Sequence, residues 1–379
     1  RGIENTSGPL GQGHTNAVGA AIAVRFLAAR FGEWMTHKTY AFISDGGIQE
    51  EISQGAGRIA GYLGLNNLIM FYDANKVQLS TMVDQVTTED TAKKYEAWGW
   101  RVITINGNDP DEIRGALLKA NQEKEKPFLI IGETIMGKGA VTDNGDSFEG
   151  QVSTHGQPLS KAGGSVSNTI QKLGGDPGNP FQVFPEVEQY YNSFIEKKRE
   201  LVAARKKQYT EWQLNQPEKA DRLRRILSGE APPLEIESIK LKENMASRSA
   251  SGAVLGALSG NIDNMIVISA DLSNSDKTEG FLKNTKPLTH RDFSGAFLHA
   301  GVSELTMAAI ANGLALHHIL PVCGTFFAFS DFMKPAVRLA ALMELPVIYV
   351  WTHDSFRVGE DGPTHQPIEQ EAQIRLLEK

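Results

Sequence analysis

The stretch TYAFISDGG, residues 39–47, sets the architecture of the first half of the chain. Its apolar part, Thr39–Ile43, runs directly into the polar turn Asp45-Gly46-Gly47. The same pattern returns at Asn67–Tyr72, which is followed by Asp73-Ala74-Asn75. Apolar runs without polar alternation are typical of parallel strands that are covered on both faces. We therefore expect two strands of one parallel sheet, with Asp45 and Asn75 at their carboxyl ends.

Further apolar runs and helical patterns alternate with these two strands. Strands separated by helices indicate βαβ units, in which a parallel sheet has helices on both faces. The Gly-, Ser- and Asn-rich segment 163–180 is expected to be a loop. The remaining elements that we expect in this half are strands at 100–105 and 128–134, a helix ending near Leu63 and a helix at 109–122.

The second half repeats this architecture after a charged helical stretch at 185–228 and a stretch with two prolines at 229–243 that looks like a linker. We expect a fold of two tandem doubly wound parallel-sheet α/β domains, both incomplete at the chain ends. The domains are predicted at 1–214 and 246–379, with an interdomain linker at 215–245. The expected elements of the second half are strands at 265–269, 320–324 and 346–351, and helices at 249–258, 302–316, 332–343 and 367–379.

Composition limits the classes of function. The net charge is −7, from 38 Lys and Arg against 45 Asp and Glu, which argues against a nucleic-acid or membrane-surface binder. No run approaches the roughly 20 apolar residues of a membrane span. The single cysteine, Cys323, permits no intrachain disulfide and is expected to be a buried apolar residue. We therefore expect a cytoplasmic protein.

Asp45 and Asn75 are candidate metal ligands. They are 30 residues apart, and each follows an apolar strand. Carboxylate and amide oxygens are hard donors suited to Mg²⁺ or Ca²⁺, which would also hold a diphosphate. Taken singly, Asp45 would be an ordinary turn residue and Asn75 a helix cap. Their matching placement favours a metal site at the ligand-binding edge of the sheet.

Two other segments carry groups that titrate. Glu304 lies among Val302, Leu305 and Met307 in an apolar helix, where burial would raise the pKa of its carboxyl group. An interface salt bridge is the alternative role for this residue. The segment THDSFRVGEDGPTHQP, residues 352–367, holds two histidines and several carboxylates. A zinc site is the competing interpretation there, but no cysteine joins the segment.

These motifs resemble those of the transketolases, a thiamine-diphosphate-dependent enzyme family. The family's Gly-Asp-Gly and Asn segments correspond to residues 44–46 and 73–75, with Ser44 in place of the first Gly. The resemblance implies that Asp45, Asn75 and the carbonyl of Val77 bind the metal. The loop GPLGQG, residues 8–13, is similar to the family's loop along the cofactor. The cofactor contacts that this part of the resemblance implies are Gly8, Leu10, Asp45, Gly46, Asn75 and Val77.

The resemblance also implies roles at the reacting end of the cofactor. Glu304 would bond a pyrimidine ring nitrogen, and three phenylalanines would surround the aminopyrimidine, although the family often has Tyr at position 332. Asp271 would lie near the thiazolium of the partner subunit, and His155 near the diphosphate and the donor sugar. The implied catalytic residues are Glu304, His365 and His155, and the implied aromatic contacts are Phe326, Phe329 and Phe332.

Residues 352–367 look like the family's sugar-binding signature, apart from Phe356-Arg357. Together with Arg248 and Ser275, this likeness implies binding of sugar phosphates. His353 would contact the acceptor's phosphate, Asp361 a substrate hydroxyl, and His365 would lie near the reacting carbon. The implied reaction is reversible transfer of a two-carbon ketol unit between sugar phosphates in the pentose phosphate pathway. The implied assembly is a homodimer with the active site across subunits.

Alternative functions remain open at this stage. Within the class they are dihydroxyacetone synthase and deoxyxylulose-phosphate synthase, and outside it a truncated, non-catalytic cofactor-binding subunit. A nicotinamide-binding loop is disfavoured, because Gly13 is not followed by a glycine at the required spacing. The likeness runs from Gly8 to Gln370. This chain lacks the histidines that the family carries before its GPLGQG loop, and it lacks the family's C-terminal domain. We therefore expect an internal piece of a longer polypeptide.

Overall fold

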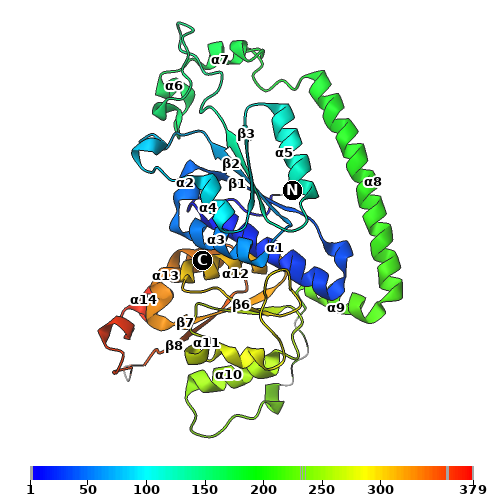
Figure 1. Cartoon of the computed structure of the whole chain (residues 1–379), viewed down its shortest axis with the longest axis vertical. Coiled ribbons are helices and arrows are strands. Elements are labelled where there is room, and N and C mark those ends of the chain that lie inside the picture. Colours follow the sequence, from blue (N-terminus) through cyan, green and yellow to red (C-terminus); the bar gives the residue numbers. More distant parts are fainter. Residues whose placement is uncertain (1–2, 231, 233, 235, 356–357, 378–379) are drawn as a thin grey trace.

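Two four-stranded parallel sheets organise the molecule, one in each half of the chain (Figure 1). The computed structural model describes residues 3–230, 232, 234, 236–355 and 358–377. Phe356-Arg357, where the chain departs from the family signature, lies outside these residues. The expected fold class is confirmed.

The first sheet has the strand order β1-β2-β4-β3, and all of its neighbours are parallel. Its central strands carry fully buried side chains such as Leu68 and Ile130. Ser44, the last residue of the first strand, pairs with Asp73 of the second, so the polar segments after both strands meet at one edge. The four predicted strands are confirmed as β1 (Thr39–Ser44), β2 (Leu68–Ala74), β3 (Arg101–Asn106) and β4 (Phe128–Glu133).

The helices of this half depart from expectation at several places. The turn predicted at 45–47 is the start of the short helix α2 (Asp45–Gln49). The segment predicted as a loop at 163–180 contains α7 (Val166–Lys172), and α4 (Thr91–Ala97) was not predicted. The other helices are α1 (Gln12–Phe31), α3 (Glu51–Leu63), α5 (Pro110–Gln122), α6 (Leu159–Ala162) and the 3₁₀ turns η1 (Glu33–Met35), η2 (Val83–Gln85) and η3 (Val152–Thr154).

The connector between the halves is two helices, α8 (Pro185–Asn215) and α9 (Pro217–Ser228). The break falls at Pro217, which lacks the N–H that would continue the hydrogen-bond ladder. The C-terminal part of α8 packs on the body, where the Trp212 ring lies 5.0 Å from that of Trp34. The rest of α8 stands apart from the first sheet (Figure 1).

The second sheet has the order β6-β5-β7-β8, again all parallel. Its strand β6 was not predicted, because a three-residue strand has no readable period. Over the described part of the helix predicted at 367–379, only α14 is helical, and residues 378–379 lie outside the described residues. The strands are β5 (Met265–Ser269), β6 (Phe297–His299), β7 (Leu320–Phe326) and β8 (Ile348–Thr352), and the helices are α10 (Ser247–Leu258), α11 (Ser273–Asp276), α12 (Glu304–Ala315), α13 (Ser330–Leu342), α14 (Gln370–Arg375) and η4 (Ile236–Ser238), η5 (Thr278–Lys283), η6 (Phe327–Phe329) and η7 (Pro363–His365).

Helices α1 and α12 pack against each other between the two sheets (Figure 1). Their backbones approach closely at two glycines. A Cβ atom on Gly19 would lie 2.2 Å from the carbonyl oxygen of Ile310, and one on Gly313 would lie 2.0 Å from that of Asn16. One continuous apolar core therefore joins the halves through this contact, and it includes Cys323 as expected.

We expect Gly313→Ala to lower the free energy of unfolding by about 3 kcal/mol, because the new methyl group has only backbone to displace. The matched control is Gly115→Ala in α5, where a Cβ atom would meet nothing within 4 Å. That substitution should raise stability by about 0.5–1 kcal/mol. Denaturant unfolding of both variants measures the difference. Equal stability would contradict the close approach of α1 and α12.

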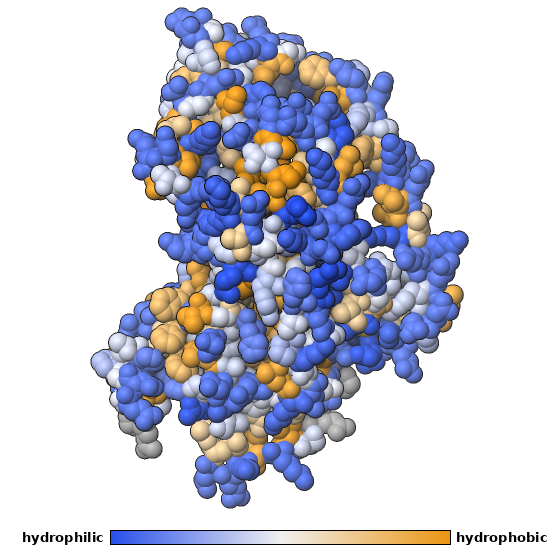
Figure 2. All heavy atoms as spheres, viewed as in Figure 1, coloured by the Kyte–Doolittle hydropathy of each residue, from blue (hydrophilic) through white to orange (hydrophobic). Residues whose placement is uncertain are grey.

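The face of the molecule seen in Figure 2 is mainly hydrophilic, with apolar residues gathered in separate patches. Strongly exposed apolar side chains of the chain include Phe42, Phe181 and Phe332. Among the described residues, no helix combines the length and the apolar character that crossing a membrane requires.

Candidate active site

Asp45 lies at the carboxyl end of β1, as the first residue of α2, and it is buried. Its carboxylate accepts three hydrogen bonds from the segment at the end of β2. The Tyr72 hydroxyl donates to Oδ1 at 2.6 Å, and the backbone N–H groups of Asn75 and Lys76 donate to Oδ2 at 3.1 Å each. The two polar segments that follow β1 and β2 are therefore joined through one carboxylate.

This carboxylate lacks a compensating positive charge. Burial raises the pKa of Asp45 above its usual value, while the bond from Tyr72 acts in the opposite direction. Within the described parts of the chain, no ion pair involves Asp45. Burial and the bond to Asp45 also raise the pKa of the Tyr72 hydroxyl, which stays protonated as a donor. A bound cation would favour the ionised carboxylate here.

Asn75 and Val77 continue the same segment. The Asn75 side-chain oxygen accepts from the Val77 N–H at 3.0 Å, and its Nδ2 lies 3.5 Å from Asp73 Oδ1. A carboxylate has about four lone pairs, and the three hydrogen bonds to Asp45 use three of them, so one remains for a metal ion. The amide oxygen of Asn75 uses one lone pair for the Val77 N–H and also has a second one for a metal ion. This set of hard oxygens fits Mg²⁺ or Ca²⁺ better than a softer metal.

The glycine-rich loop lies beside this carboxylate. A Cβ atom on Gly46 would lie 3.0 Å from Cδ1 of Leu10, so the loop and the start of α2 are in contact. Leu10 is half-exposed, and around Gly8 there is open space. Leu10, Ser44 and Gly47 line a common cavity of about 730 Å³.

The first turn of α1 places His14 in the wall of the same cavity. The side chain is buried, and burial lowers the pKa of the imidazole to about 4. Among the described residues, its Nε2 has no hydrogen-bond partner. His14 is therefore a neutral ring near neutral pH.

His155 follows the 3₁₀ turn η3 and is half-buried. Its Nδ1 is buried and has no partner among the described residues. The next residue, Gly156, approaches the segment after β2: a Cβ atom there would lie 3.0 Å from Leu79. The loop that carries His155 thus packs against Leu79 of the segment after β2, and no hydrogen bond between described residues joins it to Asp45.

Glu304 is the first residue of α12 and is half-buried. Burial raises the pKa of its carboxyl group. The loop before it is fixed by Arg58 of α3, which donates to the Ala300 carbonyl at 2.8 Å and to Ser303 Oγ at 3.4 Å. Among the described residues, Glu304 forms no ion pair, and an interface salt bridge would need a second chain.

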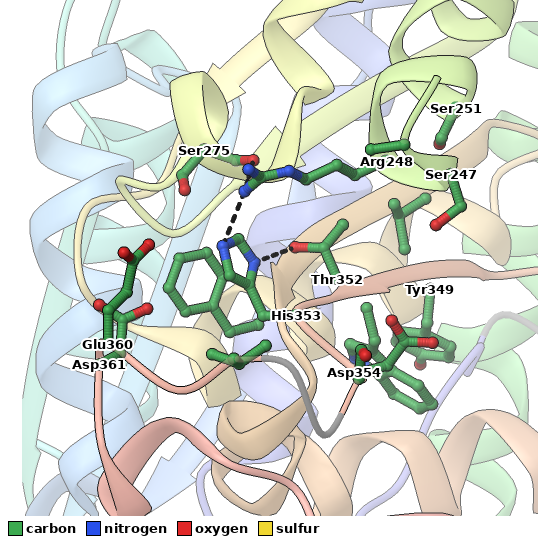
Figure 3. Close-up of a pocket in the computed structure, with 16 residues that line it drawn as sticks. Ser247, Arg248, Ser251, Ser275, Tyr349, Thr352, His353, Asp354, Glu360 and Asp361 are labelled. Atoms are coloured by element: carbon green, nitrogen blue, oxygen red, sulfur yellow. Dashed lines mark hydrogen bonds between the residues drawn. The ribbon is translucent and has the colours of Figure 1, made fainter. Parts of the chain in front are cut away.

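The second half holds a cavity of about 860 Å³ at the carboxyl ends of its strands. Arg248 Nη1 donates to the Ser275 carbonyl at 3.4 Å and lies 2.8 Å from His353 Nε2. Figure 3 shows the His353 ring between Arg248 and Thr352, with Glu360 and Asp361 on another side of the cavity. Four of the residues predicted to bind the sugar phosphate line it together, namely Arg248, Ser275, His353 and Asp361.

Aromatic rings extend this site toward α13. The Phe326 ring lies 3.8 Å from that of His353 and is stacked on Phe329 at 5.7 Å. Phe329 lies 5.3 Å from His365 and 6.2 Å from Phe332. The three predicted phenylalanines therefore form one cluster with His353 and His365, although Phe332 is 62% exposed.

The loop after β5 carries Asp271 and Ser275. Asp271 is exposed and has a positive φ of 64°. The loop is held by Asp276, which the sequence reasoning missed. This buried carboxylate accepts from the Thr278 N–H at 2.8 Å and the Ser269 hydroxyl at 3.2 Å. Its hydroxyl-rich neighbours Ser269, Ser273, Ser275 and Thr278 were the available signal.

Within one chain these residues form separate groups. One surrounds Asp45 and one surrounds His353, and Glu304 has no bond to either among the described residues. No hydrogen bond or ion pair between described residues links the three. The described residues also contain no group of three His, Cys, Asp or Glu that could hold a metal ion.

Residues 1–232 match the family model described as transketolase, thiamine diphosphate binding domain. The chain belongs to the transketolase family. Residues 243–379 match the transketolase pyrimidine binding domain. The resemblance seen in the sequence is thereby confirmed, and the transketolase chain carries a thiamine-diphosphate-binding domain.

Curated transketolases resemble the whole of this chain. The transketolase of Bacillus subtilis is 39% identical over 389 residues, which cover 99% of this chain and 56% of that protein. Transketolase 2 of Vibrio parahaemolyticus is 39% identical, with coverage of 99% and 57%. The chain thus spans little more than half the length of these transketolases.

Solved structures show the same relation. The transketolase from Leishmania mexicana has a TM-score of 0.92 and 36% identity, covering 99% of this chain and 56% of that one. A Pichia stipitis transketolase in complex with sedoheptulose 7-phosphate has a TM-score of 0.91 and 32% identity, with the same coverage. The two sheets described above are therefore those of a transketolase.

Proposed function

We propose that the protein transfers a two-carbon ketol unit reversibly from a ketose phosphate to an aldose phosphate. The observation that carries this proposal is the cavity that Arg248, Ser275, His353 and Asp361 line together. A guanidinium group and an imidazole suit a phosphate, because both can donate charge-assisted hydrogen bonds to its oxygens. Asp361 suits a sugar hydroxyl, which would donate to its carboxylate. The Pichia stipitis complex with a sugar phosphate supports the same substrate class.

Thiamine diphosphate fits the residues of the first half through a divalent ion. Asp45 and Asn75 would provide side-chain oxygens and Val77 its carbonyl, with Mg²⁺ or Ca²⁺ as the ion. The buried Asp45 carboxylate, which has no ion-pair partner among the described residues, supports this assignment. Gly8, Leu10 and Gly46 would line the path of the cofactor. When bound, the cofactor supplies an electron sink for breaking and forming the carbon–carbon bond.

Residues of the second half would orient the cofactor and move protons. Burial favours a proton on the Glu304 carboxyl group, which can then share it with a ring nitrogen. The face of the cluster formed by Phe326, Phe329 and Phe332 suits an aromatic ring. His365 touches that cluster, and one ring nitrogen of His155 has no partner in the described parts of the chain, so both imidazoles are placed to act on a substrate's protons. Asp271 would lie near the thiazolium.

A homodimer would unite the separate groups. We propose that Glu304 of one protomer meets the Asp45 group of its partner, since a two-fold axis would create two such sites.

We propose domains at 1–214 and 246–379 with a linker at 215–245, and a cytoplasmic location.

A coupled assay with xylulose 5-phosphate and ribose 5-phosphate tests the activity. We expect turnover that requires thiamine diphosphate and Mg²⁺. Turnover with formaldehyde as the preferred acceptor would indicate dihydroxyacetone synthase, and release of carbon dioxide from pyruvate would indicate deoxyxylulose-phosphate synthase. Cofactor binding with no turnover of any substrate would indicate a non-catalytic subunit. The last three results would each overturn the proposed transfer.

A further inference from the structure

The loop that leads into Glu304 has little support from its own residues. Gly301 has a positive φ of 73°, a conformation that glycine adopts without strain. Ser303, the residue before α12, makes no side-chain hydrogen bond that caps the helix. Glu304 itself is half-buried, whereas the helix is buried from its third residue onward. The place of the Glu304 carboxyl group therefore depends on what holds residues 300–303.

An arginine from the other half of the chain holds this loop. Arg58 of α3 donates from Nη2 to the Ala300 carbonyl at 2.8 Å and to Ser303 Oγ at 3.4 Å. The Ser303 hydroxyl donates in turn to the Ala300 carbonyl at 3.1 Å, so it is turned away from the helix that it precedes. A Cβ atom on Gly301 would lie 3.5 Å from Arg58 Nη2. The loop is therefore gathered around one guanidinium group.

Arg58 can serve as a fixed point because α3 is itself held firmly. One face of this helix is buried in the core. The Ser53 hydroxyl donates to the Gly47 carbonyl at 2.6 Å, which ties α3 to α2. A Cβ atom on Gly55 would lie 2.3 Å from Thr306 Oγ1, so α3 also packs closely against the first turn of α12. The guanidinium group thus extends from a rigid helix.

Arg58 acts on Glu304 through the backbone of the loop. Between described residues, no ion pair joins the two side chains. A guanidinium group that paired with the carboxylate would lower the pKa of Glu304, whereas burial raises it. If the loop were free to move, the carboxyl group could turn into solvent and lose the burial that favours its protonated form.

We propose that Arg58 is a positioning residue for ketol transfer, which holds the Glu304 carboxyl group where it can exchange a proton with the cofactor. The inference rests on the proton-sharing role proposed above for Glu304. A misplacement of about 1 Å can lower a rate on the order of a hundredfold. Loss of the Arg58 contacts should therefore slow the reaction, while the residues proposed to bind the sugar phosphate keep their places.

Arg58→Met removes every donor and retains a long side chain. We expect kcat in the coupled assay to fall about thirty- to a hundredfold, with KM for both sugar phosphates within about threefold of wild type. Arg58→Lys, whose ammonium group can donate to the Ala300 carbonyl, should bring kcat back to within about tenfold of wild type. The matched control is Arg114→Met on α5, because Arg114 is exposed and pairs with Asp111 at 2.8 Å. Its activity should be unchanged.

A double-mutant cycle separates positioning from a merely structural role. In the Glu304→Gln background, Arg58→Met should lower the remaining rate less than about threefold, because the group that it positions is already lost. Ser303→Ala removes one contact of the guanidinium group and is the smaller change to the fold. It should lower kcat about fivefold in the wild-type protein and hardly at all in the Glu304→Gln background.

Hydrogen exchange in the cofactor-free protein tests the positioning without turnover. The Met307 N–H donates to the Ser303 carbonyl at 2.9 Å, at the start of α12. In Arg58→Met, the peptide that contains Met307 should exchange about tenfold faster, because the first turn of the helix opens more often. The peptide that contains β1 should exchange as in the wild type.

The results that would overturn the inference are distinguishable. Equal losses in both backgrounds, a normal kcat in Arg58→Met, or unchanged exchange at Met307 would each show that Arg58 does not position Glu304, while the role of Glu304 stands. A near-normal rate for Glu304→Gln would instead remove the proton-sharing role of Glu304, and the inference would fail with it.

Discussion

Glu304→Gln is expected to lower the rate of ketol transfer by about a thousandfold, the scale of a lost general acid–base group. Burial raises the pKa of this carboxyl group, which favours the protonated form that can share a proton with the cofactor. The glutamine amide has nearly the same shape but cannot exchange a proton. The coupled sugar-phosphate assay measures the loss, and thermal unfolding should show no loss of stability, since the substitution removes a half-buried carboxyl group.

Glu279→Gln is the matched control for this change. Glu279 is exposed on η5, where it pairs with Lys277 at 3.8 Å. An exposed pair contributes little, so rate and stability should both remain close to wild type. A near-normal rate for Glu304→Gln would end its assignment as the proton-sharing group.

Asp45→Ala should weaken thiamine diphosphate binding by at least about a hundredfold and remove its dependence on Mg²⁺, because a metal-ligating carboxylate is lost. The fold should also lose stability, since the Tyr72 hydroxyl and the N–H groups of Asn75 and Lys76 lose their acceptor. Each unsatisfied buried donor costs about 1–3 kcal/mol. Calorimetric titration of the cofactor at fixed Mg²⁺ and a thermal melt measure the two effects.

Two controls separate ligation from stability. Tyr72→Phe removes one bond to Asp45 and should lower the melting temperature while leaving cofactor affinity within threefold of wild type. Asp73→Ala removes an exposed carboxylate two residues from Asn75 and should also keep that affinity. Wild-type Mg²⁺ dependence in Asp45→Ala would show that this carboxylate is not a ligand.

The fold could be predicted wherever long apolar runs alternate with helical patterns. All four strands of the first sheet show this pattern in the sequence. The contact between the segments after β1 and β2 could also be predicted, because the carboxyl ends of parallel strands meet at one edge of a sheet. The helix α7 could not be predicted from its Gly- and Ser-rich surroundings. It is held by distant contacts, including the Val141 N–H donating to Thr169 Oγ1 at 3.1 Å.

The sequence motifs of the site could be predicted, but the hydrogen-bond partners of its residues could not. Residue spacing indicated that Asp45 and Asn75 lie together, yet nothing in it pointed to Tyr72 as a donor to Asp45. Likewise the signature at 352–367 indicated His353, whereas its bond to Arg248 joins residues 105 positions apart in the chain. Such contacts depend on how strands and loops pack, and sequence spacing does not report that packing.

The claim that the active site is shared between two protomers is tested most directly by mixing the two inactive variants. The Asp45→Ala and Glu304→Gln variants are mixed at equal concentration and either refolded together or left to exchange subunits. Half of the resulting dimers are then heterodimers. If the groups meet across the two-fold axis, one site of each heterodimer is intact, and about a quarter of wild-type activity should return. If both groups serve the same site within one chain, every site keeps one substitution. Absence of any recovery, with heterodimers verified, would contradict the account.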